Sequence, residues 1–201
     1  MIERESPEIN AGSMADIAFL LLIFFLVTTT MDTEIGIFKM LPDKNLQSSF
    51  KVNERNVLEI NINSKNEIFI EGHQLTPIEK VRQLVVAFID NGGGTDAEGN
   101  KCTWCQGKQQ ATASDHPAKA IIKLQSNRST SYAQYIAVQN EITGAYSQLR
   151  NRLSTSLYGI SYTDLQAAYK RNKNDEVTHA KIRSIKEKYP QHILEEEPLQ
   201  Q

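Results

Sequence analysis

One carboxylate, Asp16, stands at the start of a strongly apolar stretch and has the clearest capacity for chemistry in this chain. Residues 17–27 carry no polar side chain. A carboxylate in a membrane helix is costly and is usually kept for a function. Because burial disfavours the charged form, such a group can take up and release protons. The alternative is an aspartate at the water interface, favoured by the dipole at the start of a helix.

The neighbours of Asp16 at helical spacing are small or polar on one side and bulky on the other. We predict that they face a pore: Gly12, Ser13, Phe19, Leu20, Ile23 and Val27. Ala11, Ala15 and Ala18 add small side chains that permit another helix to approach closely. Asp16 has no cationic partner in its own segment, so either a partner comes from another chain or the side chain is protonated part of the time.

Residues 14–31 are predicted to form one transmembrane helix. These 18 residues would span about 27 Å as a helix, close to the hydrocarbon core of a bilayer. Ten Leu, Ile, Phe or Val residues favour insertion by roughly 3–6 kcal/mol, against about 2.5–3.5 kcal/mol for a central Asp. A cleaved signal peptide is a weaker alternative, because residues 1–10 hold one Arg and three Glu. A buried core helix is the other alternative, and flanking charges do not fix the orientation.

The remaining composition argues against an enzyme or a nucleic-acid-binding protein. The net charge of the 201 residues is −2, which gives no basic surface for nucleic acid. The four histidines, at positions 73, 116, 179 and 192, show no catalytic spacing and are expected on the surface or in loops. No phosphate-binding glycine loop or Ser-His-Asp pattern is present in the sequence, and we expect no cofactor and no metal.

The part after the apolar stretch has the pattern of a small α/β domain. Alternating apolar residues predict strands at 58–62 and 68–70, and a third short strand at 120–124. Thr76, Pro77 and Glu79 suggest an N-cap, a first-turn proline and a capping-box glutamate for a helix that ends near Asp90. A second helix is predicted from Tyr132 to about Leu153. The expected order is therefore β-β-α-β-α.

These residues together resemble the ExbD/TolR family of biopolymer transport proteins. The resemblance lies in Ile9-Asn10, in Asp16, in the run from Leu20 to Thr28, and in the β-β-α-β-α order. The family often has Thr-Pro and an aromatic residue before the aspartate, whereas this chain has Gly12-Ser13-Met14-Ala15.

The resemblance implies a role as the proton-channel, or stator, component of an inner-membrane motor. Asp16 would carry protons, and the proton motive force would energise TonB-dependent outer-membrane transport or a related envelope process. The implied partners are a pentameric ring of an ExbB/TolQ-like polytopic protein, a second ExbD-like chain and a TonB-like periplasm-spanning protein. The alternatives are a membrane-tethered binding module without a proton role and a secreted enzyme with a signal anchor.

The resemblance also implies a domain arrangement. A cytoplasmic segment (1–13) and the transmembrane helix (14–31) precede a linker (32–56), which has an extended piece near 35–41. A periplasmic domain (57–160) and a helical C-terminal extension (161–201) follow.

Two segments depart from the family pattern. Residues 91–117 form an insertion, expected to be a mobile surface excursion, which holds Cys102 and Cys105. The pair could form a disulfide, half of a metal site or free thiols, and an oxidising compartment favours the disulfide. After the second helix no clear closing strand is seen, and residues 157–162 are the one candidate.

Overall fold

The computed structural model describes residues 11–29, 53–71 and 74–196, and the chain divides into two compact units. The first unit is Met1–Ser49 and contains helix α1 (Ala11–Thr29). The second unit, Phe50–Gln201, contains all the other elements, beginning with a short 3-10 helix, η2 (Glu54–Asn56). The expected extended piece at 35–41, most of the expected linker, and the Ile9-Asn10 pair lie outside the described residues.

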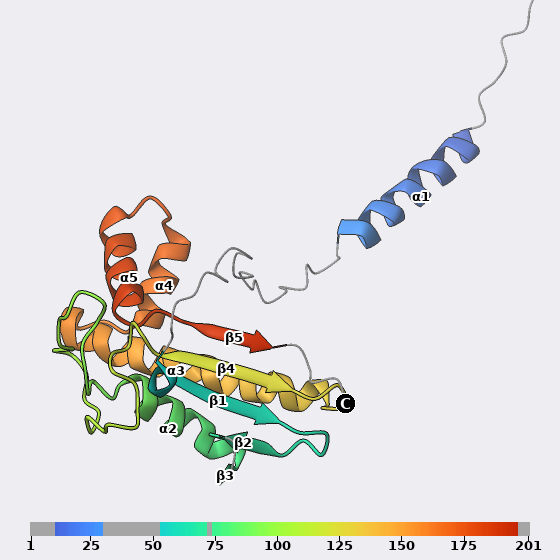
Figure 1. Ribbon diagram of the computed structural model, residues 1–201. Coiled ribbons are helices and arrows are strands. Elements are labelled where there is room, and N and C mark those ends of the chain that lie inside the picture. The colour runs from blue at the N-terminus through green and yellow to red at the C-terminus, as the bar shows by residue number, and fades with distance from the viewer. Residues whose placement is uncertain (1–10, 30–52, 72–73, 197–201) are drawn as a thin grey trace, which may run out of the picture. The chain divides into compact units, whose positions relative to one another are not determined.

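A five-stranded sheet forms the centre of the second unit (Figure 1), in the order β3-β2-β1-β4-β5. The strands are β1 (Val57–Ile62), β2 (Ile68–Ile70), β3 (Gln74–Leu75), β4 (Ile121–Ser126) and β5 (Ile193–Glu196). Strand β2 pairs antiparallel with both β1 and β3, whereas β1, β4 and β5 run parallel. The β1–β2 turn is stabilised by Asn63, whose side-chain oxygen accepts the backbone N–H groups of Lys65 and Glu67.

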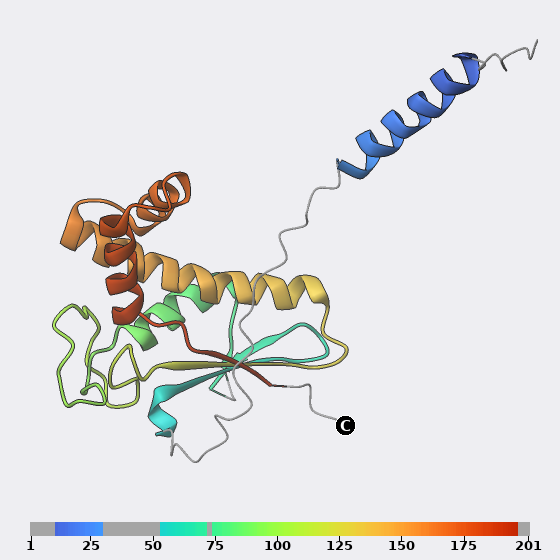
Figure 2. The ribbon, with the colours of Figure 1, turned by 90° about the horizontal axis from the view of Figure 1, so that it is seen from above.

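Two helices cover the same face of this sheet (Figure 2): α2 (Ile78–Ile89) and α3 (Tyr132–Tyr158). Alternate strand residues point toward them, so Ile60, Ile122 and Leu124 are almost completely buried. The helices contribute a larger apolar set to the same core: Val81, Val85, Phe88, Ile89, Val138, Ile142, Ala145, Tyr146 and Leu149. The mixed α/β class is confirmed, and the observed elements contain the expected β-β-α-β-α order.

Element boundaries differ from the sequence expectation in small ways. Pro77, not Thr76, is the N-cap of α2, and no side chain caps that helix. The second helix continues to Tyr158, because its C-cap Gly159 adopts the left-handed conformation only there (φ 69°). The two-residue strand β3 was not expected, since two residues show no period.

The C-terminal extension is built into the second unit. It forms α4 (Tyr162–Arg171) and α5 (Glu176–Lys188), capped by Ser161 and Asp175. Leu165, Ile182, Ile185 and Tyr189 from this segment join the main core.

The expected closing strand at 157–162 is wrong. Leu157 and Tyr158 are the last turn of α3, and the strand that closes the sheet is β5. Strand β5 pairs only with β4 among the described strands, and just one of its four residues, Ile193, is half-buried. Its sequence is Ile-Leu-Glu-Glu, so the alternation of apolar and polar residues that reveals a half-buried strand is missing.

Candidate functional site

Helix α1 presents one charged residue among apolar side chains. Asp16 is the sixth of its 19 residues, so it lies beyond the first turn, and it is exposed. The large apolar side chains from Met14 to Leu26 are 41–62% exposed within the described unit. Among the described residues, none forms a hydrogen bond or an ion pair with the Asp16 carboxylate. The helix therefore offers a free carboxyl group next to a large uncovered apolar surface.

A search of the described residues finds no helix that is both long and apolar enough to cross a membrane. The side chains of Ser13 and Val27 lie outside the described residues, although both positions belong to α1.

The second unit places its own aspartate, Asp90, in a contrasting position. Asp90 is the C-cap of α2 and is 3% exposed. Its carboxylate accepts hydrogen bonds from Arg152 Nη2 (2.7 Å) and from the Tyr189 hydroxyl (2.6 Å). It also accepts one from the Gln106 backbone N–H (3.2 Å). Asp90 thus joins α2, the 91–117 insertion, α3 and the C-terminal extension, and hydrogen bonding to its charge raises the pKa of Arg152 despite desolvation.

The 91–117 insertion is closed on itself at Asn91 and bonded to the rest of the domain at Ser114 and Asp115, which corrects the expectation of a purely surface excursion. The Asn91 side-chain amide is buried and donates to the carbonyls of Gln110 and Ser114. Ser114 donates to the Phe88 carbonyl, and Asp115 forms an ion pair with Arg55 (3.0 Å). Buried polar groups need such partners, and the sequence, rich in loop-forming residues, gave no sign that they were available.

Cys102 and Cys105 are joined by a disulfide within this insertion. Trp104, between them, packs edge-to-face on the His116 ring (5.5 Å between centroids), and Lys188 Nζ lies 3.9 Å from the centre of its ring. No group of three or more His, Cys, Asp and Glu side chains in the described ranges is placed to hold a metal ion.

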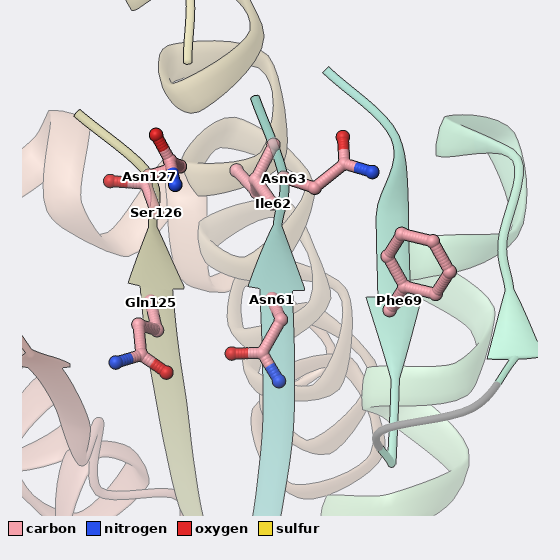
Figure 3. A pocket seen from close by; sticks show the side chains of 7 residues that line it. All are labelled: Asn61, Ile62, Asn63, Phe69, Gln125, Ser126 and Asn127. Atoms are coloured by element: carbon pink, nitrogen blue, oxygen red, sulfur yellow. The ribbon is translucent and has the colours of Figure 1, made fainter. Parts of the chain in front are cut away.

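A pocket lined by amide, hydroxyl and apolar side chains lies on the sheet face opposite α2 and α3, at the carboxyl ends of β1 and β4 (Figure 3). Asn61 of β1 is in register with Phe69 of β2 and with Gln125 of β4, and the three side chains lie on neighbouring strands. The rest of the lining is Ile62, Asn63, Ser126 and Asn127. These groups can donate and accept hydrogen bonds, but the lining contains no titratable side chain, so the pocket suits binding and not acid–base chemistry.

The model of the biopolymer transport proteins ExbD and TolR matches residues 3–152. The chain belongs to the ExbD/TolR family. The match covers α1 with Asp16, the strands β1 to β4, α2, the insertion and most of α3. Members of this family are membrane-associated, take part in biopolymer transport and generally work with ExbB/TolQ-like and TonB/TolA-like partners. The comparison with curated proteins finds no match.

The residues expected at the family's site fall on α1, as the sequence suggested. Phe19, Leu20 and Ile23 are exposed on the helix one and two turns after Asp16, and Gly12 lies one turn before it.

Two features of the second unit were not foreseen from the sequence. His116 lies in a loop, as expected, but it is almost completely buried, because the insertion returns to the sheet there and Trp104 packs on its ring. The hydrogen-bonded group around Asp90 was missed, since its members are up to 99 positions apart in the chain. A carboxylate at the apolar end of a helix, such as Asp90, could have suggested that it needs hydrogen-bond partners. No spacing in the sequence identifies which residues those partners are. His179 and His192 are exposed, and His73 lies outside the described residues.

Proposed function

We propose that this chain is the proton-translocating component of an inner-membrane energy-transducing complex, with Asp16 as the group that takes up and releases the proton. Asp16 is the one charged residue of α1, and the large apolar side chains around it are uncovered. An isolated carboxyl group in an apolar helix is expected to be functional. Membership of a family engaged in energised transport supports the same role.

The position of Asp16 argues against the interfacial alternative. The stabilisation of an acidic group by the helix dipole fades within the first turn, and Asp16 is the sixth residue. An exposed helix-start aspartate would also not need ten apolar neighbours. The observation that carries the proposal is thus one carboxylate, without a partner among the described residues, in the second turn of an apolar helix.

In this proposal α1 crosses the membrane once. Its 19 residues measure about 28 Å as a helix, near the thickness of the hydrocarbon core. The N-terminus is cytoplasmic, and the Phe50–Gln201 unit is periplasmic. The polar side of α1 is covered by the helices of a pentameric ExbB/TolQ-like ring, together with a second ExbD-like chain. Protonation of Asp16 changes the state of the ring, and the periplasmic unit passes the change to a TonB-like protein.

The test is Asp16→Asn, which keeps the size of the side chain but cannot release a proton. Uptake that depends on the proton motive force is measured in cells, with assembly of the complex checked in parallel. We expect assembly to be retained and uptake to be lost. Asp16→Glu serves as the matched control and is expected to give intermediate uptake, because the carboxyl remains but moves by one methylene. Wild-type uptake in an assembled Asp16→Asn complex would remove the proposal.

A second measurement separates this proposal from a membrane-tethered binding module, which the pocket of Figure 3 would serve. A photo-crosslinking residue at Ile23, two turns after Asp16, is expected to form adducts with a polytopic membrane protein. Adducts with lipid alone would favour the tethered module. Neither reading assigns a catalytic residue, so the chain is not proposed to be an enzyme.

A further inference from the structure

The insertion and the C-terminal extension meet at Trp104. Lys188, the last residue of α5, places its ammonium group 3.9 Å from the centre of the indole ring. His116 packs against the ring from another side, and Trp104 as a whole is partly buried against the main core. A cation so close to an indole ring is held there by the ring's negative face. Trp104 therefore anchors the end of α5.

The disulfide fixes the backbone that carries Trp104. The residue lies inside the four-residue ring closed by Cys102 and Cys105. Cys105 packs directly on Gly92 at the beginning of the insertion, where an added Cβ would come within 2.7 Å of Cys105 Cβ. The next two residues also bond to Asp90. The Gln106 N–H donates to its carboxylate, and the Gly107 N–H donates to its backbone carbonyl. Both cysteines are only half-buried, so a solvent-borne thiol can reach the bond.

Strand β5 follows this anchor by a few residues. Of its own side chains, Ile193 packs on the core, Glu195 accepts a bond from Gln139 Nε2 (3.1 Å), and Glu196 pairs with Lys123 (3.1 Å). Tyr189, next to Lys188, is fully buried; its hydroxyl bonds to Asp90, and its carbonyl accepts two bonds from Arg150 (2.7 and 3.0 Å). Beyond it, Ile122 N–H donates to the His192 carbonyl (2.9 Å), where β5 begins to run along β4. Leu194 is 44% exposed, so β5 buries little apolar surface of its own. A short edge strand of this kind depends on what holds its ends.

We propose that the Cys102–Cys105 disulfide is a reversible redox site, whose reduction by a dithiol frees Trp104 and loosens β5 from β4. One thiolate of the dithiol attacks a sulfur of the disulfide and forms a mixed disulfide, and the other thiolate displaces the protein sulfur. The protein gains two electrons and two protons and holds two thiols, while the reductant leaves as a disulfide. Release of β5 uncovers the outer backbone edge of β4, a surface open to pairing with another strand.

The test follows two amides by hydrogen exchange in the full chain, one in β4 and one directly after it. Ile122 N–H reports the docking of β5, because its acceptor is the His192 carbonyl. Asn127 N–H reports the β1 side, because it donates to the Ile62 carbonyl (3.0 Å) and to Thr130 Oγ1 (3.1 Å). On reduction with dithiothreitol we expect exchange at Ile122 to accelerate at least about tenfold, with exchange at Asn127 unchanged.

Two variants test whether the disulfide holds β5 through Trp104. Trp104→Ala with the disulfide intact should accelerate exchange at Ile122 without reductant, because the anchor is lost. The double variant Cys102→Ser/Cys105→Ser should behave like the reduced chain and show no response to dithiothreitol. Equal exchange at Ile122 in the oxidised and reduced chain overturns the proposal. Equal acceleration at Ile122 and Asn127 also overturns it, since that would be a general loss of stability and not release of β5.

Discussion

Asp16 and Asp90 are both carboxylates beside apolar helical residues, yet their surroundings are opposite. Asp90 is buried and accepts three hydrogen bonds, one of them from a guanidinium group. Asp16 is exposed in α1, and no described residue bonds to it. A carboxylate whose two oxygens are bonded to groups from three other segments suits a structural junction. A carboxyl group without such partners, in an apolar helix, suits the proton transfer proposed above.

This comparison predicts that the same substitution has opposite consequences in the two units. Asp90→Asn should destabilise the Phe50–Gln201 unit by about 2–3 kcal/mol, because Arg152 loses its charged partner. The value is below that of a fully buried pair, since the Arg152 side chain is 34% exposed. Urea unfolding can be followed by the fluorescence of Trp104, the one tryptophan in the sequence. Asp16→Asn should leave that unfolding curve unchanged, and a comparable loss of stability in both variants would break the comparison.

The two aspartates also show what could be predicted from the sequence. Asp16 was found because an apolar run is a local signal, and a single charge in it stands out. The strands β1 and β2 were found for the same reason, since their alternation is complete within a few residues. The partners of Asp90 and Tyr189 and the strand β5 were not found, because the residues that they contact are distant in the chain. The insertion was misjudged on the same grounds: its composition is that of a loop, and only the fold shows that Asn91, Ser114 and His116 are buried.

A smaller effect on stability is expected from the protonation of His116, a buried side chain that is neutral in the folded chain. The Nδ1 atom of His116 accepts the Ala118 backbone N–H (3.1 Å), so the imidazole is neutral there. Burial lowers the pKa of His116; the charges of Asp96 and Glu98 oppose this, while those of Lys119 and Lys188 add to it. The unfolded chain therefore binds a proton more readily than the folded chain. Stability should be full above the ordinary histidine value of 6.5 and should fall as the pH drops below it.

The matched variant for this prediction is His116→Asn, which keeps an acceptor for Ala118 but does not titrate. Unfolding by urea is measured at pH 7.5 and at pH 5 for both chains. The wild type should lose more stability than the variant between these two values. If both chains lose the same amount, the pH dependence comes from other groups, and burial of His116 contributes nothing to it.

The smallest effect on stability is expected for Glu141, a carboxylate that is paired but not fully buried. Glu141 of α3 pairs with Arg82 of α2 through two bonds, Nε–Oε2 at 2.9 Å and Nη2–Oε1 at 3.1 Å. The Arg82 side chain is 44% exposed, so water screens the pair, although its two-pronged geometry favours it over most surface pairs. Arg82→Gln should therefore cost about 0.5 kcal/mol, and Glu141→Gln about the same. The double variant should cost little more than either single one, because each substitution already removes the charge pair.

Unfolding at low and high salt provides the control. The difference in stability between wild type and these variants should shrink in high salt, whereas the stability lost in Asp90→Asn should persist because Asp90 is buried. If the stability lost in Asp90→Asn also shrank in high salt, Asp90 would behave as a surface charge. Burial would then not explain the contrast between Asp90 and Asp16.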